Sequence, residues 1–291
     1  MTRSIPALIV SGFLGSGKTS LVRWLLESAQ ASGTRVAVVS NEFGELGIDQ
    51  AVLGDGGEAF VELEGGCVCC QLSSELLDTL EMLHRRVDPD WIVIETSGVA
   101  LPGETQANLG RDPVRAWIAD DLAAVVVNAE QVGAGRDLEG TFEYQLTSAD
   151  LIVLNKIDLV AANELPGIER RIREIEPDAP IVRCEHGRVD PEVLFPSDLG
   201  RRTSARTTKR GDRPHVHEAF ASEVMEVESG ATEEDLQARF AALGALRTKG
   251  FVETAAGLRL LQGVGTRVQL HPVTAPPPPH LLGRVVVIRR R

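Results

Sequence analysis

The octapeptide GFLGSGKT, from Gly12 to Thr19, is the most specific chemical signal in this chain of 291 residues. It fits the pattern G-x-x-x-x-G-K-[ST], in which backbone N–H groups and the positive end of the following helix hold phosphate oxygens. The lysine of such a loop reaches the β- and γ-phosphates and acts in catalysis, and the last hydroxyl binds Mg²⁺. We therefore predict that a nucleotide is bound by Gly12, Gly15, Ser16, Gly17, Lys18, Thr19 and Ser20, with Lys18 as a catalytic residue and Thr19 as a magnesium ligand.

A second motif, Asn155-Lys156-Ile157-Asp158, follows an apolar run and has the form N-K-x-D. A carboxylate at the last position can accept two hydrogen bonds from N1–H and the 2-amino group of guanine, a match that adenine cannot make. The motif predicts GTP as the nucleotide, held at its base by Asn155, Lys156 and Asp158. An ATP-dependent kinase built on the same phosphate loop is the alternative.

Acidic residues follow two further apolar runs. Glu95 begins Glu95-Thr96-Ser97-Gly98, where a carboxylate would hold Mg²⁺ and the Gly98 N–H would approach the γ-phosphate and lose that contact on hydrolysis. We assign catalytic roles to Glu95 and Gly98, a strand-ending turn being the alternative. Glu42 and Glu45, in NEFGE, are candidate ligands of Mg²⁺ or of a second metal, or only solvated carboxylates.

Three of the four cysteines are clustered in Gly65-Gly66-Cys67-Val68-Cys69-Cys70. Thiolates favour Zn²⁺ and related soft ions, and an incomplete protein ligand set suits a site that passes its metal on. We predict a metal site at Cys67, Cys69 and Cys70; small buried residues or a redox pair are the alternatives. The isolated Cys184 reads as a core residue.

These motifs need a scaffold that brings strand ends together. Apolar runs predict strands at residues 7–10, 35–40, 91–94, 123–127, 151–154 and 180–182, and apolar periodicity predicts helices at 75–86 and 164–175. Alternating strands and helices predict an α/β fold of the P-loop NTPase kind, with a mainly parallel sheet covered by helices. Ligands collect at the carboxyl ends of such strands. Ser73 or Ser74 is the predicted N-cap of the helix at 75–86, which would place the cysteines at the positive end of that helix.

The pattern changes after residue 195. We predict a nucleotide-binding domain at 1–195, a basic flexible linker at 196–214 and a smaller α+β domain at 215–291. In the last domain, Thr232 is the expected N-cap of a helix, and strands are expected at residues 215–227, 246–254, 257–262, 266–270 and 284–288. His215 and His217 alternate and could share a metal, although histidines near a linker are more often incidental, and that explanation is favoured.

Composition excludes several classes of protein. The net charge of −12 argues against a nucleic-acid partner. No apolar run is long enough to span a membrane, and no secretory segment is recognised. Clustered thiols beside a nucleotide loop indicate a reducing, cytoplasmic location.

Taken in order, GFLGSGKT, NEFGELGID, GGCVCC, ETSG and NKID resemble the motifs of the CobW-type metallochaperone GTPases, relatives of HypB and UreG. Arg247-Thr248-Lys249-Gly250-Phe251 and its flanking strands resemble the C-terminal domain of that family. The resemblance implies slow GTP hydrolysis coupled to delivery of Zn²⁺ or Co²⁺ to a client metalloprotein or a cobalamin-pathway protein. A homodimer is a further candidate assembly. The histidine-rich stretch of many members is reduced here to His215 and His217.

The expected activity is thus that of a GTPase whose nucleotide state sets the affinity of a thiolate metal site. The alternative is a metal sensor or interaction protein that uses GTP as a structural ligand with little turnover.

Overall fold

The computed structural model describes residues 5–40, 59–62, 71–195, 220–273, 277 and 279–290, with the backbone alone at 59–62, 71–74 and 119. The chain divides into two compact units. The first comprises Met1–Pro177 and Ile181–Val189, and the second comprises Asp178–Pro180 and Asp190–Arg291. The predicted linker at residues 196–214 lies outside the described residues, so the predicted domain boundaries stay a prediction.

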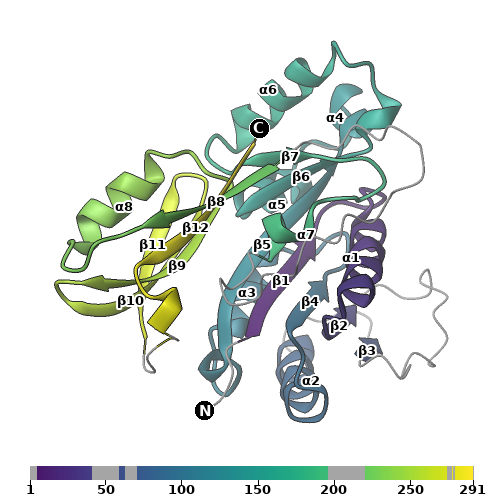
Figure 1. The fold of residues 1–291 in the computed structure, drawn as a ribbon. Helices are drawn as coiled ribbons and strands as arrows, with labels where there is room; N and C mark the ends of the chain where they lie inside the picture. Colours follow the sequence, from purple (N-terminus) through teal and green to yellow (C-terminus); the bar gives the residue numbers. More distant parts are fainter. Residues whose placement is uncertain are drawn as a thin grey trace. The chain divides into compact units, whose positions relative to one another are not determined.

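The first unit is built on a parallel sheet of seven described strands, in the order β3-β2-β4-β1-β5-β6-β7 (Figure 1). The strands are β1 (Ile5–Ser11), β2 (Val36–Ser40), β3 (Ala59–Glu62), β4 (Trp91–Glu95), β5 (Ile118–Asn128), β6 (Leu151–Asn155) and β7 (Ile181–Arg183). Every strand pair in this sheet is parallel, so all carboxyl ends lie along one edge. The predicted α/β fold is confirmed.

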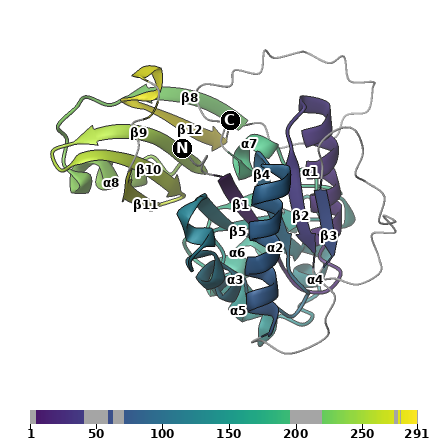
Figure 2. The same ribbon diagram turned by 90° about the horizontal axis from the view of Figure 1, so that it is seen from below.

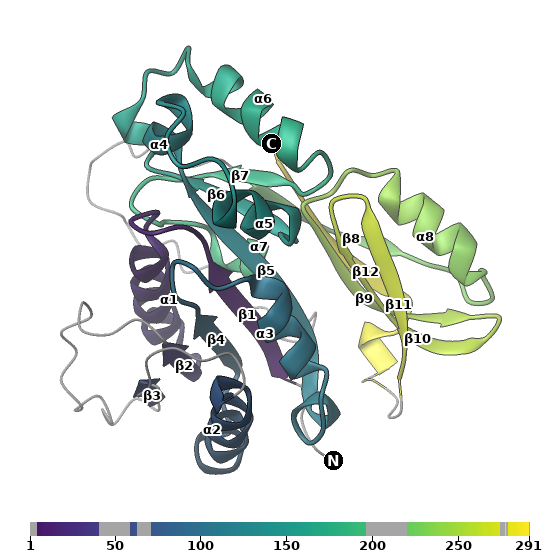
Figure 3. The same cartoon turned by 180° about the vertical axis from the view of Figure 1, so that it is seen from behind.

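Helices cover both faces of this sheet, as the views from below and from behind show (Figures 2 and 3). The helices of this unit are α1 (Lys18–Ser32), α2 (Gln71–Val87), α3 (Pro102–Leu109), α4 (Ala129–Gly133), α5 (Thr141–Thr147) and α6 (Leu165–Ile175), with 3-10 turns at Val114–Ala116 and Ile157–Leu159. The apolar side of α1 is buried, because its residues recur at the helical spacing Leu21, Leu25 and Ala29.

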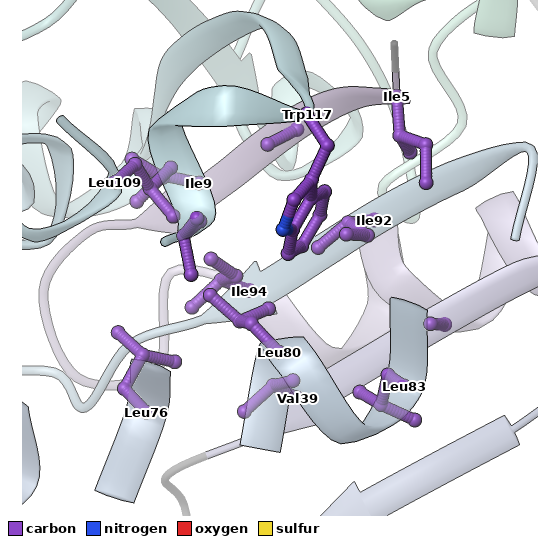
Figure 4. Close-up of a cluster of buried hydrophobic side chains, with 13 residues drawn as sticks. Ile5, Ile9, Val39, Leu76, Leu80, Leu83, Ile92, Ile94, Leu109 and Trp117 are labelled. Carbon is purple, nitrogen blue, oxygen red and sulfur yellow. The ribbon is translucent and has the colours of Figure 1, made fainter. Parts of the chain in front are cut away.

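One hydrophobic cluster joins α2 to the sheet (Figure 4). Leu76, Leu80 and Leu83 of α2 pack with alternate residues of β1, β2 and β4 and with Trp117. The figure shows the Trp117 ring next to Ile92 and above Leu80. Burial of these side chains fixes α2, which starts directly after Cys70 in the sequence, on the same sheet that carries the phosphate loop.

Three local expectations need correction. The helix predicted at residues 75–86 begins at Gln71, so Ser73 and Ser74 lie inside it and neither is its N-cap. The short edge strand β3 was not predicted, since four residues carry little periodicity. The strand predicted at 123–127 begins at Ile118, because pairing with β1 extends it through the polar Asp120 and Asp121.

The second unit has an antiparallel sheet in the order β11-β10-β9-β12-β8, again among the described residues. Its elements are α7 (Pro191–Leu194), β8 (Phe220–Glu226), α8 (Glu233–Ala241), β9 (Arg247–Thr254), β10 (Gly257–Val264), β11 (Arg267–Pro272), a 3-10 turn at Pro279–Leu281, and β12 (Arg284–Arg290). Leu236 and Phe240 of α8 are buried with apolar residues of this sheet. Thr232 is the N-cap of α8, as predicted, with its hydroxyl accepting from Asp235 N at 3.1 Å. The predicted smaller α+β unit is confirmed.

In the part of the chain that the structure describes, no helix combines the length and apolar character needed to cross a membrane.

Candidate nucleotide site

The loop between β1 and α1 has the backbone that phosphate binding requires. Gly12 and Gly17 adopt φ values of 137° and 104°, a region that favours glycine. A Cβ on Gly12 would run into the backbone oxygen of Val126, and one on Gly17 into the side-chain amide of Asn155. Ser16 Oγ is buried without a hydrogen-bond partner among the described residues, so the loop holds an unsatisfied polar group where a phosphate oxygen would lie.

The first turn of α1 places Thr19 against the end of β4. Thr19 Oγ1 donates a hydrogen bond of 2.7 Å to Glu95 Oε1. Lys18 and Glu95 are both buried, with 3% and 1% of their surface exposed, whereas Ser20 is exposed. A hydroxyl and a carboxylate oxygen are ligands that Mg²⁺ accepts, so the pair fits the predicted magnesium site.

Glu95 also reaches the end of β2. Ser40 Oγ donates to Glu95 Oε2 at 3.4 Å, and Ser40 is level with Glu95 in the strand register. Ser40 is in turn level with Glu62, the last residue of β3. β2 and β3 therefore end at the same level of the sheet. In the sequence, Glu42 and Glu45 follow β2, and the three clustered cysteines follow β3.

The loop after β4 packs on the phosphate loop. A Cβ on Gly98 would overlap the side chain of Leu14, so the absence of a side chain permits this approach. The Gly98 and Ala100 carbonyls both accept from Gln145 Nε2, at 3.2 and 2.9 Å. Gly98 thus lies beside the phosphate loop, where its predicted role requires it.

Asn155 joins the base motif to the phosphate loop. Its Nδ2 donates to Ser16 O at 3.0 Å, and its Oδ1 accepts from Gly187 N at 2.9 Å. The following Lys156 has a positive φ of 60°, which turns the chain into the short 3-10 turn that exposes Asp158. Asn155 therefore links the phosphate loop to the segment that carries the predicted base-reading residues.

The loop after β7 is a part of this site that the sequence did not reveal. Cys184 Sγ donates to Asn155 Oδ1 at 3.4 Å, so this cysteine is buried, as predicted, and also contacts the base motif. Gly187, with φ of 70°, lies so close to the backbone of Leu21 that a Cβ would collide with it. The sequence offered one signal for this part of the site, because the loop follows the carboxyl end of a predicted strand, where ligands collect in such sheets.

Several predicted ligands lie outside the described residues. They are Glu42, Glu45, Cys67, Cys69, Cys70, His215 and His217. Within the described residues, no group of three or more histidine, cysteine, aspartate or glutamate side chains is arranged to hold a metal.

A glycine-rich loop between a parallel strand and a helix, with a hydroxyl on a buried carboxylate and an asparagine-anchored base motif, defines a P-loop nucleotide-binding protein. Comparison with known proteins makes this more specific. A family model described as "CobW/HypB/UreG, nucleotide-binding domain" matches residues 6–183. The chain belongs to this family, as its motifs predicted.

Two curated relatives match most of the chain. The zinc chaperone CobW of Sinorhizobium sp is 34% identical, covering 91% of this chain and 86% of its own length. The zinc chaperone CobW of Pseudomonas aeruginosa is 35% identical, covering 92% and 82%. Among solved structures, that of the Zn(II)-bound YjiA GTPase from E. coli superposes with a TM-score of 0.52 at 25% identity, covering 99% of this chain and 94% of that one.

Proposed function

We propose that this protein is a GTP-hydrolysing metallochaperone that binds Zn²⁺ at Cys67, Cys69 and Cys70 and delivers it to a client metalloprotein. Its metal affinity would depend on whether GTP or GDP is bound. Zn²⁺ is favoured over Co²⁺ because relatives at 34% and 35% identity are zinc chaperones. A cobalamin-pathway client, a homodimer and a cytoplasmic location remain part of the same proposal.

The observation that carries the proposal is the contact of Glu95 with both Thr19 and Ser40. If Thr19 and Glu95 gained or lost a bound Mg²⁺, the Glu95 carboxylate would shift. Because Ser40 donates to the same carboxylate, the end of β2 would be affected. Because the last residues of β2 and β3 are level in the sheet, the end of β2 is one strand spacing from β4, which carries Glu95, and the end of β3 is two strand spacings from it. The sheet thus supports coupling between the phosphate site and the thiolates.

The residues of the site divide the chemistry among them. The phosphate loop and Lys18 would hold the phosphates, and Asp158 would select guanine. Thr19 and Glu95 would hold Mg²⁺, which when bound neutralises charge that develops on the phosphates. Gly98 would donate its N–H to the γ-phosphate and lose that partner after hydrolysis. Release of this loop would then loosen the segments that begin after Ser40 and Glu62.

The coupling required is modest. A hundredfold difference in metal affinity between the two nucleotide states corresponds to about 2.7 kcal/mol. One buried, charge-assisted hydrogen bond that forms in only one state would supply about that amount.

The proposal is tested by a competitive Zn²⁺ and Co²⁺ titration with GDP and with a non-hydrolysable GTP analogue. The wild type is compared with Cys69→Ala and with Val68→Ala, a control in the same segment that removes no thiol. We expect about a hundredfold change in Zn²⁺ affinity between the nucleotides in the wild type and the control. The change should vanish in Cys69→Ala. Equal affinities in both states would show that nucleotide does not gate the metal.

The alternative, a sensor that uses GTP as a structural ligand, predicts a different kinetic result. Single-turnover hydrolysis, measured with and without Zn²⁺, should exceed the buffer rate for a chaperone. A rate indistinguishable from buffer, together with tight GTP binding, would favour the sensor. Displacement of labelled nucleotide by ATP as well as GTP would instead favour the kinase.

A further inference from the structure

Gln145, on α5, is a buried amide that contacts the backbone of the loop after β4. No part of its surface is exposed. Its Nε2 donates to two carbonyl oxygens of that loop, Gly98 O at 3.2 Å and Ala100 O at 2.9 Å. An NH₂ group has two hydrogens, so both are used on the segment that follows Glu95.

These bonds fix the direction of a peptide group. Because the peptide is planar and trans, the Val99 N–H points opposite to the Gly98 carbonyl, which is directed at Gln145. Gly98 is also in contact with Leu14 of the phosphate loop. The loop after β4 is therefore held by hydrogen bonds from Gln145 and by packing against Leu14, and the orientation of its backbone N–H groups depends on both.

The other end of the amide indicates that stability alone does not account for this residue. Gln145 Oε1 is buried without a hydrogen-bond partner in the part of the chain that the structure describes. An unsatisfied buried acceptor destabilises a fold, and an apolar side chain of the same shape would avoid that cost. A hydrophobic residue could not replace the two hydrogen bonds that Gln145 Nε2 donates to the loop after β4.

We infer that Gln145 is a positioning residue for the GTPase reaction, which holds the Gly98–Ala100 backbone in register with the phosphate loop. The inference rests on the proposed function, because it assumes that this loop senses the γ-phosphate. Among the described residues, the hydrogen bonds of Gln145 go to the loop after β4 and not to the phosphate loop or the base motif, so it should act on the GTP state and spare the binding of GDP.

The test compares Gln145→Met with Gln131→Met. Methionine keeps the volume and removes the donors. Gln131 is a matched control, since it is also buried and donates from Nε2 to a backbone oxygen, Asp137 O at 3.4 Å, away from the loop after β4. For each variant, the full-length protein is assayed for single-turnover GTP hydrolysis and for its affinities for GDP and a non-hydrolysable GTP analogue.

For Gln145→Met we expect hydrolysis to fall about tenfold and the affinity for the GTP analogue to fall about fivefold, the size expected for lost hydrogen bonds of one amide. GDP affinity should stay within about twofold of wild type, and Gln131→Met should leave all three values unchanged. Gln145→Leu provides a second variant if methionine prevents folding. Leucine also has no donor for either carbonyl and buries no charge, so the same pattern is expected.

Two results would overturn the inference. One is a folded Gln145→Met or Gln145→Leu protein with the wild-type ratio of GTP-analogue to GDP affinity. The other is an equal loss of GDP and GTP-analogue binding, which would show a merely structural role. A wild type that binds GDP and the GTP analogue but does not hydrolyse GTP would contradict the proposed GTPase, and the affinity ratio would still decide the role of Gln145.

Discussion

Thr19 and Glu95 are 76 positions apart in the chain, yet Thr19 Oγ1 donates a hydrogen bond of 2.7 Å to Glu95 Oε1. One belongs to the first turn of α1 and the other ends β4, the strand paired with β1. The pair brings a hydroxyl and a buried carboxylate to the phosphate loop. In the proposed function, a change of nucleotide or of bound Mg²⁺ would alter this contact and thereby the position of the neighbouring strand ends.

The first prediction concerns this pair. Thr19→Ala should weaken Mg²⁺-dependent GTP binding about ten- to hundredfold, because a hydrogen bond to a charged group contributes about 1.5–3 kcal/mol. Thr19→Ser keeps the hydroxyl and should bind within a few-fold of wild type. Titration with labelled GTP in Mg²⁺ and in EDTA measures the difference. Equal losses in both buffers would mean that Thr19 does not act through the metal.

The second prediction concerns two glycines of the same loop. Gly17→Ala should abolish nucleotide binding and lower stability by more than the strain of about 1–2 kcal/mol expected for a side chain at positive φ, since its Cβ would also meet the Asn155 amide. Gly15→Ala is the control, with φ of 71° and no atom within 4 Å of an added Cβ. In thermal unfolding it should show the strain alone. Thermal unfolding and GDP titration of both variants test this, and indistinguishable variants would refute it.

The third prediction concerns the choice of base. Asp158→Asn exchanges one acceptor oxygen for a donor, so it should lose one of two hydrogen bonds to guanine and weaken GDP binding at least about tenfold. The variant should gain affinity for xanthosine diphosphate, which carries an oxygen in place of the 2-amino group. Competition among GDP, XDP and ADP measures the change. An unaltered preference for GDP would remove Asp158 from the base site.

The fourth prediction concerns the attachment of α2. Leu80 is fully buried in the cluster that joins this helix to the sheet, so Leu80→Ala should destabilise the protein by about 2–5 kcal/mol. Asp78→Ala, an exposed position on the same helix, should change stability by less than about 0.5 kcal/mol. Urea unfolding of both variants provides the comparison. A small effect at Leu80 would mean that α2 is only loosely tied to the nucleotide site.

Much of the fold could be read from local pattern. The strands ending at Ser11, Glu95 and Asn155 are continuous apolar runs, because a parallel sheet buries both faces of each strand. The apolar pattern did not predict the strand residues that are held by pairing with a neighbouring strand and not by their own hydrophobicity. Asp120 and Asp121 belong to β5 because β1 pairs with them, and the four residues of β3 are held by β2.

The sequence by itself determined the chemistry of the nucleotide site and the family of this protein. The motifs GFLGSGKT and NKID are defined by particular residue types at particular spacings. Each motif is contained in a short run of consecutive residues, eight for the first and four for the second, so it can be recognised without the fold. Glu95 could also be recognised from the sequence, because it follows an apolar run and therefore marks the end of a strand.

Only the tertiary structure decided which side chains meet. Asn155 binds both Ser16 and Gly187, and Gln145 binds the carbonyls of Gly98 and Ala100, although neither glutamine nor asparagine shows such partners in the sequence. The side chains of these amides reach across 32 to 139 positions of the chain. Such contacts depend on the order of strands in the sheet and on helix packing, which are set by the burial of the whole core and not by any local motif.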